Sequence, residues 1–112
     1  MRQVILDTSF ILTCVRQKID FFYWLRTEDI KPIIPEQVLS ELAGLGVELA
    51  LKIINMNDFE LAKIPGKDAD AAIINFTKEN PEVIVATLDK GLKKKIKNRK
   101  LVIRQKKKLE II

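Results

Sequence analysis

The stretch VILDTSFIL, residues 4–12, decides the fold expected for this chain. Its first three residues, VIL, form a strand that is apolar on both faces, which is typical of a parallel sheet covered by helices. Asp7 follows this strand directly, and Thr8 or Ser9 can cap a helix that continues to about Val15. Open α/β folds build their sites at the carboxyl edge of the sheet, so Asp7 is a candidate site residue.

The rest of the chain alternates strands and helices. EVIVATLD, residues 82–89, repeats the opening pattern, with Asp89 directly after an apolar run. Apolar spacing predicts further strands at 31–35, 101–104 and 109–112, a loop or short strand at 58–64, and helices at 19–28, 35–45, 47–56, 66–80 and 91–97. This order predicts one α/β domain, residues 1–112, with a central parallel sheet covered on both faces.

Composition restricts the chemistry that the chain can carry. It has no histidine, so a metal site must be rich in oxygen ligands, which suits Mg²⁺ or Mn²⁺ and argues against a histidine-ligated zinc site. The single cysteine, Cys14, lies in an apolar run, which predicts a small buried side chain. Since no apolar run reaches the length of a membrane span and the N-terminus lacks a signal-peptide pattern, we expect a cytoplasmic protein.

Charge is distributed unevenly along the sequence. Residues 90–112 contain eleven lysines and arginines against one acid, Glu110, whereas the net charge of the whole chain is +5. Residues 1–89 are therefore net acidic. A basic C-terminal segment beside an acidic region suits an enzyme that acts on a polyanion through bound cations.

Four acidic residues stand in contexts that suit a metal-dependent nuclease: Asp7, Glu41, Asp70 and Asp89. Asp7 and Asp89 follow strands, Asp70 opens a helix and Glu41 lies inside one, so the fold can bring their carboxylates to one pocket. Carboxylates held close together repel one another and raise one another's pKa unless a cation lies among them.

The same residues carry a resemblance to a known family. VILDTSFIL, PEQVLSEL, KDADAAI and VATLDKGLKKKI occur in the order and at the spacing of the four motifs of the PIN-domain ribonucleases, and the resemblance covers nearly the whole chain. SELAGLGVELALKI and VATLDKGLKKKIK resemble, more narrowly, the PIN subfamily of archaea and eukaryotes that processes small-subunit ribosomal RNA precursors.

This resemblance implies a three-layer α/β/α fold and a metal-dependent endoribonuclease. The four acids are then both the catalytic residues and the ligands of one or two Mg²⁺ or Mn²⁺ ions, which orient a water and stabilise charge on the scissile phosphate. The implied products are a 5′-phosphate and a 3′-hydroxyl. Outer groups that orient the ligands would be Ser9, Thr87 and Asp68. We expect contacts to the RNA backbone from Lys93, Lys94, Lys95 and Lys97.

Each candidate also has a purely structural interpretation. Asp7 and Asp89 can cap the helices that follow them, and Glu41 can be an ordinary exposed helix residue. Asp68 competes with Asp70 in the same first turn, so one can cap the helix while the other binds metal. The lysine run can be a solvated face.

Other functions fit a similar scaffold. Toxin ribonucleases of toxin–antitoxin pairs share the four acids and are of similar size. A non-catalytic PIN scaffold that binds RNA in ribosome assembly has no need for a repulsive carboxylate cluster. A receiver domain has adjacent acids after its first strand, where this chain has Thr8 and Ser9. The resemblance favours RNA as the partner, with pre-ribosomal RNA as the substrate, and leaves a homodimer or ribosome-assembly proteins open as further partners.

Overall fold

The computed structural model describes residues 1–105 and 107–112; Lys106, one of the basic C-terminal residues, lies outside the described residues. Within them, six strands form one sheet in the order β3-β2-β1-β4-β5-β6. The strands are β1 (Arg2–Leu6), β2 (Ile30–Pro35), β3 (Glu60–Ala62), β4 (Ile84–Ala86), β5 (Lys100–Arg104) and β6 (Lys108–Ile111). β1 to β5 are parallel to one another, and β6 returns antiparallel to β5.

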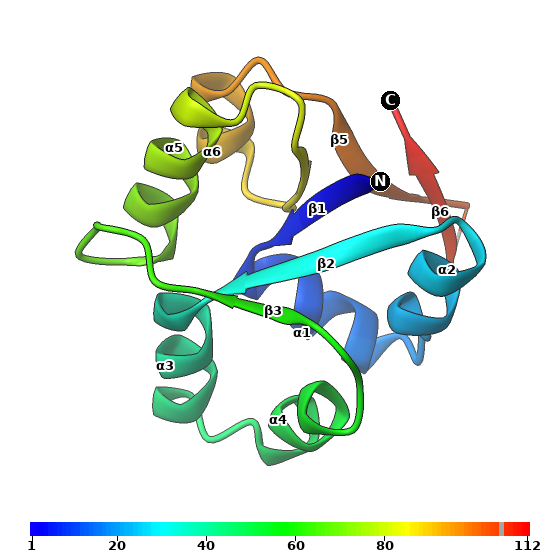
Figure 1. Cartoon of the computed structure of the whole chain (residues 1–112). Helices are drawn as coiled ribbons and strands as arrows, with labels where there is room; N and C mark the ends of the chain where they lie inside the picture. The colour runs from blue at the N-terminus through cyan, green and yellow to red at the C-terminus, as the bar shows by residue number, and fades with distance from the viewer. Residues whose placement is uncertain (106) are drawn as a thin grey trace.

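Helices cover both faces of the sheet (Figure 1). They are α1 (Thr8–Arg16), α2 (Phe21–Thr27), α3 (Glu36–Gly44), α4 (Glu48–Asn55), α5 (Ala69–Glu79) and α6 (Lys90–Lys95). The first four pack in one core with Val4 and Leu6 of β1. The last two pack in a second core with Ile5 of β1, on the opposite face. The three-layer α/β/α fold expected from the sequence is confirmed.

The apolar character of β1 places it in the middle of the sheet. Its residues Val4 to Leu6 are fully buried, and β1 pairs with β2 on one side and with β4 on the other. Because Leu6 is in register with Ala86, Asp7 and Thr87 emerge side by side where the two strands end. The Asp7 N–H continues the ladder by donating to the Ala86 carbonyl at 2.9 Å.

α1 begins without a side-chain cap. Asp7 occupies the N-cap position, but its carboxylate makes no cap hydrogen bond, and Thr8 is already the first helical residue. The expectation that Thr8 or Ser9 caps this helix is therefore wrong. The reason is that both hydroxyls donate to carboxylates at the sheet edge instead.

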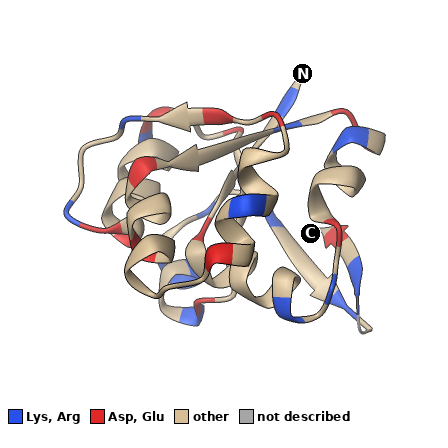
Figure 2. Cartoon of the chain, turned by 90° about the horizontal axis from the view of Figure 1, so that it is seen from below, with Lys and Arg blue, Asp and Glu red and all other residues tan. Residues whose placement is uncertain are grey.

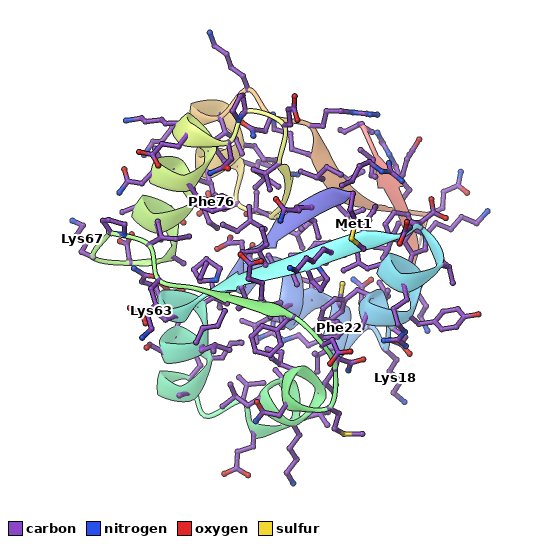
Figure 3. All side chains as sticks on the ribbon, in the orientation of Figure 1. Met1, Lys18, Phe22, Lys63, Lys67 and Phe76 are labelled. Atoms are coloured by element: carbon purple, nitrogen blue, oxygen red, sulfur yellow. The ribbon has the colours of Figure 1, made fainter. Side chains whose placement is uncertain are left out.

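The other end of α1 closes with a lysine in the left-handed region. Lys18 has φ 58°, and its N–H donates to the Val15 carbonyl while the Ile19 N–H donates to the Cys14 carbonyl. This is a Schellman motif, whose left-handed position favours glycine. Figure 3 shows the Lys18 side chain extending outward, whereas Phe22 on α2 lies in the interior.

Cys14 lies in the core between α1 and the sheet, as expected from its apolar surroundings. Burial raises the pKa of its thiol to about 12. Among the described residues, no helix combines the length and the apolar composition needed to cross a bilayer.

Candidate active site

Asp7 is held by two hydroxyl groups. The Ser9 Oγ donates to Asp7 Oδ2 at 2.9 Å and the Thr87 Oγ1 donates to the same oxygen at 2.7 Å. Asp7 is 4% exposed and Thr87 is fully buried, so protein groups and not bulk water surround this carboxylate. Burial raises the pKa of Asp7, and the hydrogen bonds from Thr87 and Ser9 oppose that rise.

The same hydroxyls connect Asp7 to the segment that follows β4. Ser9 Oγ accepts from the Leu88 N–H at 3.0 Å, and Thr87 Oγ1 accepts from the Asp89 N–H at 3.1 Å. Each hydroxyl has a single proton, which its bond to Asp7 uses, so the two backbone N–H groups meet the remaining lone pairs. The start of α1 and the end of β4 are thereby joined into one polar network.

Glu41 bridges the beginnings of two helices. From the second turn of α3 its Oε1 accepts from the Thr8 hydroxyl at 2.8 Å, and its Oε2 accepts from the Ala69 N–H at 2.9 Å. Glu41 is thus half-buried with both oxygens engaged, and its interpretation as an ordinary exposed helix residue is excluded. The positive end of the α5 dipole also favours a carboxylate at this place.

Asp70, in the first turn of α5, stands where the acidic charges meet. Partial burial raises its pKa, and the negative charges of Asp7, Asp89, Asp68 and Glu41 raise it further. Hydrogen bonds bring the segments that carry the four predicted acids together at the carboxyl edge of the sheet, since Thr87 joins Asp7 to the Asp89 N–H and Glu41 joins Thr8 to the Ala69 N–H, next to Asp70. Asp68 caps α5, because its Oδ1 accepts from the Ala71 N–H at 2.9 Å, which leaves Asp70 as the uncommitted acid of this turn.

Asp89 is both a helix cap and a member of the acidic cluster, two roles that the sequence offered as alternatives. It caps α6 through Oδ1, which accepts from the N–H groups of Gly91 at 2.8 Å and Leu92 at 3.2 Å. It also lies close enough to Asp70 to raise the pKa of that residue. A carboxylate has two oxygens, so capping by one leaves the other for a different partner.

Within the part of the chain that the structure describes, no three acidic or cysteine side chains already have the arrangement of a metal site. Both oxygens of Glu41 and one oxygen of Asp89 instead accept hydrogen bonds from hydroxyl and N–H donors. The role of the four acids as metal ligands stays a prediction.

The four lysines expected to contact RNA lie in and just after α6. This helix packs on the sheet through the buried Leu92, in the same layer as α5. Three of the lysines form its last turn, where cations also stabilise the helix dipole. Their contact with RNA stays a prediction.

Sequence reasoning missed the parts that Thr8 and Gln37 play. Thr8 is a partner of Glu41 and not a cap, and Gln37 donates through Nε2 to the carbonyls of Ile64 at 2.6 Å and Gly66 at 2.9 Å. Gln37 thus fixes the loop that leads into α5. Its position four residues before Glu41, on the same helix face, is the signal that could have found it.

Comparison with known proteins identifies the family. The model of the PIN-like domain matches residues 4–108. The chain belongs to the PIN-like domain family. The resemblance drawn from the four sequence motifs is thereby confirmed.

Individual PIN proteins are similar over most of the chain. Ribonuclease VapC4 of Methanocaldococcus jannaschii is 33% identical over 129 aligned positions, covering 99% of this chain and 97% of that protein. The rRNA-processing protein fcf1 of Schizosaccharomyces pombe is 35% identical over 101 positions, covering 84% of this chain but only 53% of fcf1. The solved PIN domain endonuclease Utp24 superposes with a TM-score of 0.83 at 33% identity, covering 97% of this chain and 90% of that one.

Proposed function

We propose that this chain is a metal-dependent endoribonuclease that hydrolyses phosphodiester bonds in RNA. The observation that carries the proposal is the hydrogen-bonded gathering of acidic positions from separate elements at the carboxyl edge of the sheet. Similarity to ribonuclease VapC4 and to the endonuclease Utp24 supports the same activity.

The donor set fits Mg²⁺ or Mn²⁺. Hard divalent cations prefer carboxylate oxygens, the chain has no histidine, and a cation would neutralise the charges that raise the pKa of Asp70. The residues that would hold it are Asp7, Glu41, Asp70 and Asp89. When bound, the ion supplies an activated water and neutralises charge that develops on the scissile phosphate.

Other groups of the chain hold these carboxylates in place. The hydroxyls of Ser9 and Thr87 orient Asp7 by donating to its Oδ2. The Thr8 hydroxyl and the Ala69 N–H orient Glu41 in the same way. Asp68 fixes the first turn of α5, which carries Asp70. These contacts exist before substrate arrives, and they fix the positions from which the carboxylates would turn toward a cation.

The lysines of α6 would bind the substrate on one side of the acids. The helix begins directly after Asp89, so its basic last turn is tied to the site by the chain itself. Contacts of Lys93, Lys94, Lys95 and Lys97 with phosphates would give affinity without reading sequence.

We propose ribosomal RNA precursors as the substrate, on the similarity to the rRNA-processing protein fcf1. The toxin ribonuclease of a toxin–antitoxin pair is the second candidate. It is favoured by one observation, namely that the similarity to ribonuclease VapC4 extends over nearly the full length of both chains, whereas this chain spans about half of fcf1.

Single-turnover cleavage of 5′-labelled RNA tests the proposal. The wild type should cut RNA with Mn²⁺ and not with chelator. Asp7→Asn should slow cutting by roughly a hundredfold or more, since it removes a charge at the reacting centre. Asp58→Asn, an exposed acid in the loop before β3, is the matched control and should cut at the wild-type rate.

Equal rates in Mn²⁺ and in chelator, or a full rate in Asp7→Asn, would refute the nuclease assignment. The substrate is tested with a small-subunit rRNA precursor and an unrelated RNA of equal length. Cutting at one position in the precursor alone supports rRNA processing, whereas equal cutting of both RNAs favours the toxin role.

A further inference from the structure

A groove of about 690 Å³ opens on the face of the sheet that is opposite to α6. It lies between the C-terminal half of α1 and the β5–β6 hairpin. Its lining residues include Thr13 and Arg16 of α1, Gln17 and Lys18 just after that helix, Leu88 and Lys107. Figure 2 shows basic segments at the end of α1 and in the C-terminal hairpin, toward the lower right.

The groove is basic. Three of its lining residues, Arg16, Lys18 and Lys107, are exposed cations, and no described lining residue is acidic. Among the described residues, none of the three forms an ion pair, since the ion pairs are Lys31 with Glu60 and Arg104 with Glu110. In the second pair, Arg104 of β5 is matched to Glu110 of β6 within the hairpin.

The groove starts beside the candidate active site. Leu88, which lines it, directly precedes Asp89, and its N–H is bonded to Ser9 in the network that holds Asp7. α1 and the partly buried Ile103 of β5 belong to one core, whereas Leu92 of α6 belongs to the core on the opposite face. The acids at the sheet edge therefore stand between two basic surfaces, one in each helical layer.

The lining suits a nucleic acid strand. Guanidinium and ammonium groups bind phosphates, the hydroxyl of Thr13 and the amide of Gln17 can hydrogen-bond a sugar or a phosphate, and Leu88 and Ile103 give apolar contact. A polymer that is cut in its interior has phosphates on both sides of the scissile bond. The α6 lysines belong to the helical layer on only one face of the sheet.

We propose that the groove between α1 and the β5–β6 hairpin binds the backbone of RNA, through Arg16 and Lys107, on the side of the acids opposite to α6. This inference rests on the proposed function, because it extends the path of the same substrate. The strand then crosses the carboxyl edge of the sheet, with its phosphates bound in both layers and the scissile bond at the acids.

The test measures RNA affinity without cleavage. A fluorescent single-stranded 20-mer RNA of mixed sequence is titrated with protein in chelator at several salt concentrations. Arg16→Gln combined with Lys107→Gln should weaken binding about tenfold and flatten the salt slope by about 1.4 units, since each phosphate contact to a single strand contributes about 0.7. Lys52→Gln combined with Lys78→Gln removes the same charge from exposed positions on α4 and α5 and should leave the slope unchanged.

One further double variant and a competitor sharpen the result. Arg16→Lys combined with Lys107→Arg keeps the charge and should bind within about twofold of the wild type. Equal losses in the groove variant and the control variant, or no loss in the groove variant, would overturn the proposal. The competitor is polyglutamate of 20 residues. If the wild type binds it more tightly than the RNA and the groove variant does not bind it, the proposal is also overturned, because the groove would then bind an acidic protein segment.

These outcomes are independent of catalysis. A wild type that cuts no RNA in Mn²⁺ but loses RNA affinity in the groove variant alone would refute the nuclease and leave the groove standing. If instead the wild type cuts RNA and the groove variant keeps the affinity and salt slope of the wild type, the groove proposal is refuted and the nuclease assignment stands.

Discussion

Replacing Thr87 with valine tests how the buried Asp7 carboxylate is stabilised. Valine has nearly the shape of threonine, so the fully buried position stays filled. The change removes the hydroxyl that donates to Asp7 Oδ2 at 2.7 Å and accepts from the Asp89 N–H at 3.1 Å. Ser9 remains as the other hydroxyl donor to Oδ2.

The expected loss follows from the charge and burial of Asp7. A hydrogen bond to a charged group contributes about 1.5–3 kcal/mol, and water cannot easily replace it around a carboxylate that is 4% exposed. Since Ser9 keeps part of the stabilisation, we expect the free energy of unfolding to fall by about 1.5–2 kcal/mol at neutral pH. The pKa of Asp7 should also rise further, because one of the bonds that lower it is lost.

The pH dependence has a definite sign. The pKa of Asp7 is higher in the fold than its ordinary value of 3.8, so the unfolded chain releases this proton first as pH rises. The contribution of Asp7 to stability without metal therefore falls as pH rises from about 3.8 through the raised pKa. Thr87→Val should extend this fall to higher pH.

Urea unfolding between pH 4 and 8 in chelator measures both effects. Thr77→Val is the matched control, because Thr77 is also buried but its hydroxyl donates only to the Ile74 carbonyl of its own helix. The control should lose less than about 1 kcal/mol and keep the wild-type pH profile. A Thr87→Val protein with wild-type stability and an unchanged pH profile would refute the reasoning.

Three other changes have expected effects on stability. Asp70→Asn removes a charge that its neighbours repel, so in chelator at pH 7 it should raise the free energy of unfolding by about 0.5–2 kcal/mol, and a less stable variant would contradict the repulsion. Lys18→Gly removes the side chain from a left-handed position at φ 58°, so it should raise the free energy of unfolding by about 0.5–1 kcal/mol and raise Tm in thermal unfolding. An unchanged Tm would show that the backbone is not strained there. Gly66→Ala should cost about 1–3 kcal/mol by the same assay, since φ is 153° and the new Cβ would stand 2.6 Å from the Ala72 nitrogen; a neutral result would mean that the loop before α5 yields.

Local patterns were sufficient to predict much of the fold and two of the acids. An apolar run followed by an aspartate correctly places Asp7 directly after β1, whereas Asp89 stands three residues after the end of β4, as the N-cap of α6. The helix starts before Asp70 and Glu41 follow from the same kind of local signal. The return of β6 antiparallel to β5 was not predicted, because it depends on the turn of a hairpin and on the sheet it joins.

The partners of the acids were harder to predict because they come from distant residues. Thr8 has the chemistry of a helix cap, yet its hydroxyl donates to Glu41, which lies 33 residues further along the chain. Periodicity alone made Glu41 an ordinary helix residue, since it cannot show that the Ala69 N–H faces the Glu41 carboxylate. The α1 groove was missed for the same reason, as Arg16 and Lys107 approach only in the folded chain.

The central claim is that Asp7, Glu41, Asp70 and Asp89 together bind divalent metal. Calorimetric titration with Mn²⁺ tests this claim most directly. The account predicts that the wild type binds Mn²⁺ and that replacing any one of the four by its amide weakens this binding at least about tenfold. Asp58→Asn should bind like the wild type. Absence of Mn²⁺ binding by the wild type, or wild-type affinity in all four amide variants, would contradict the account.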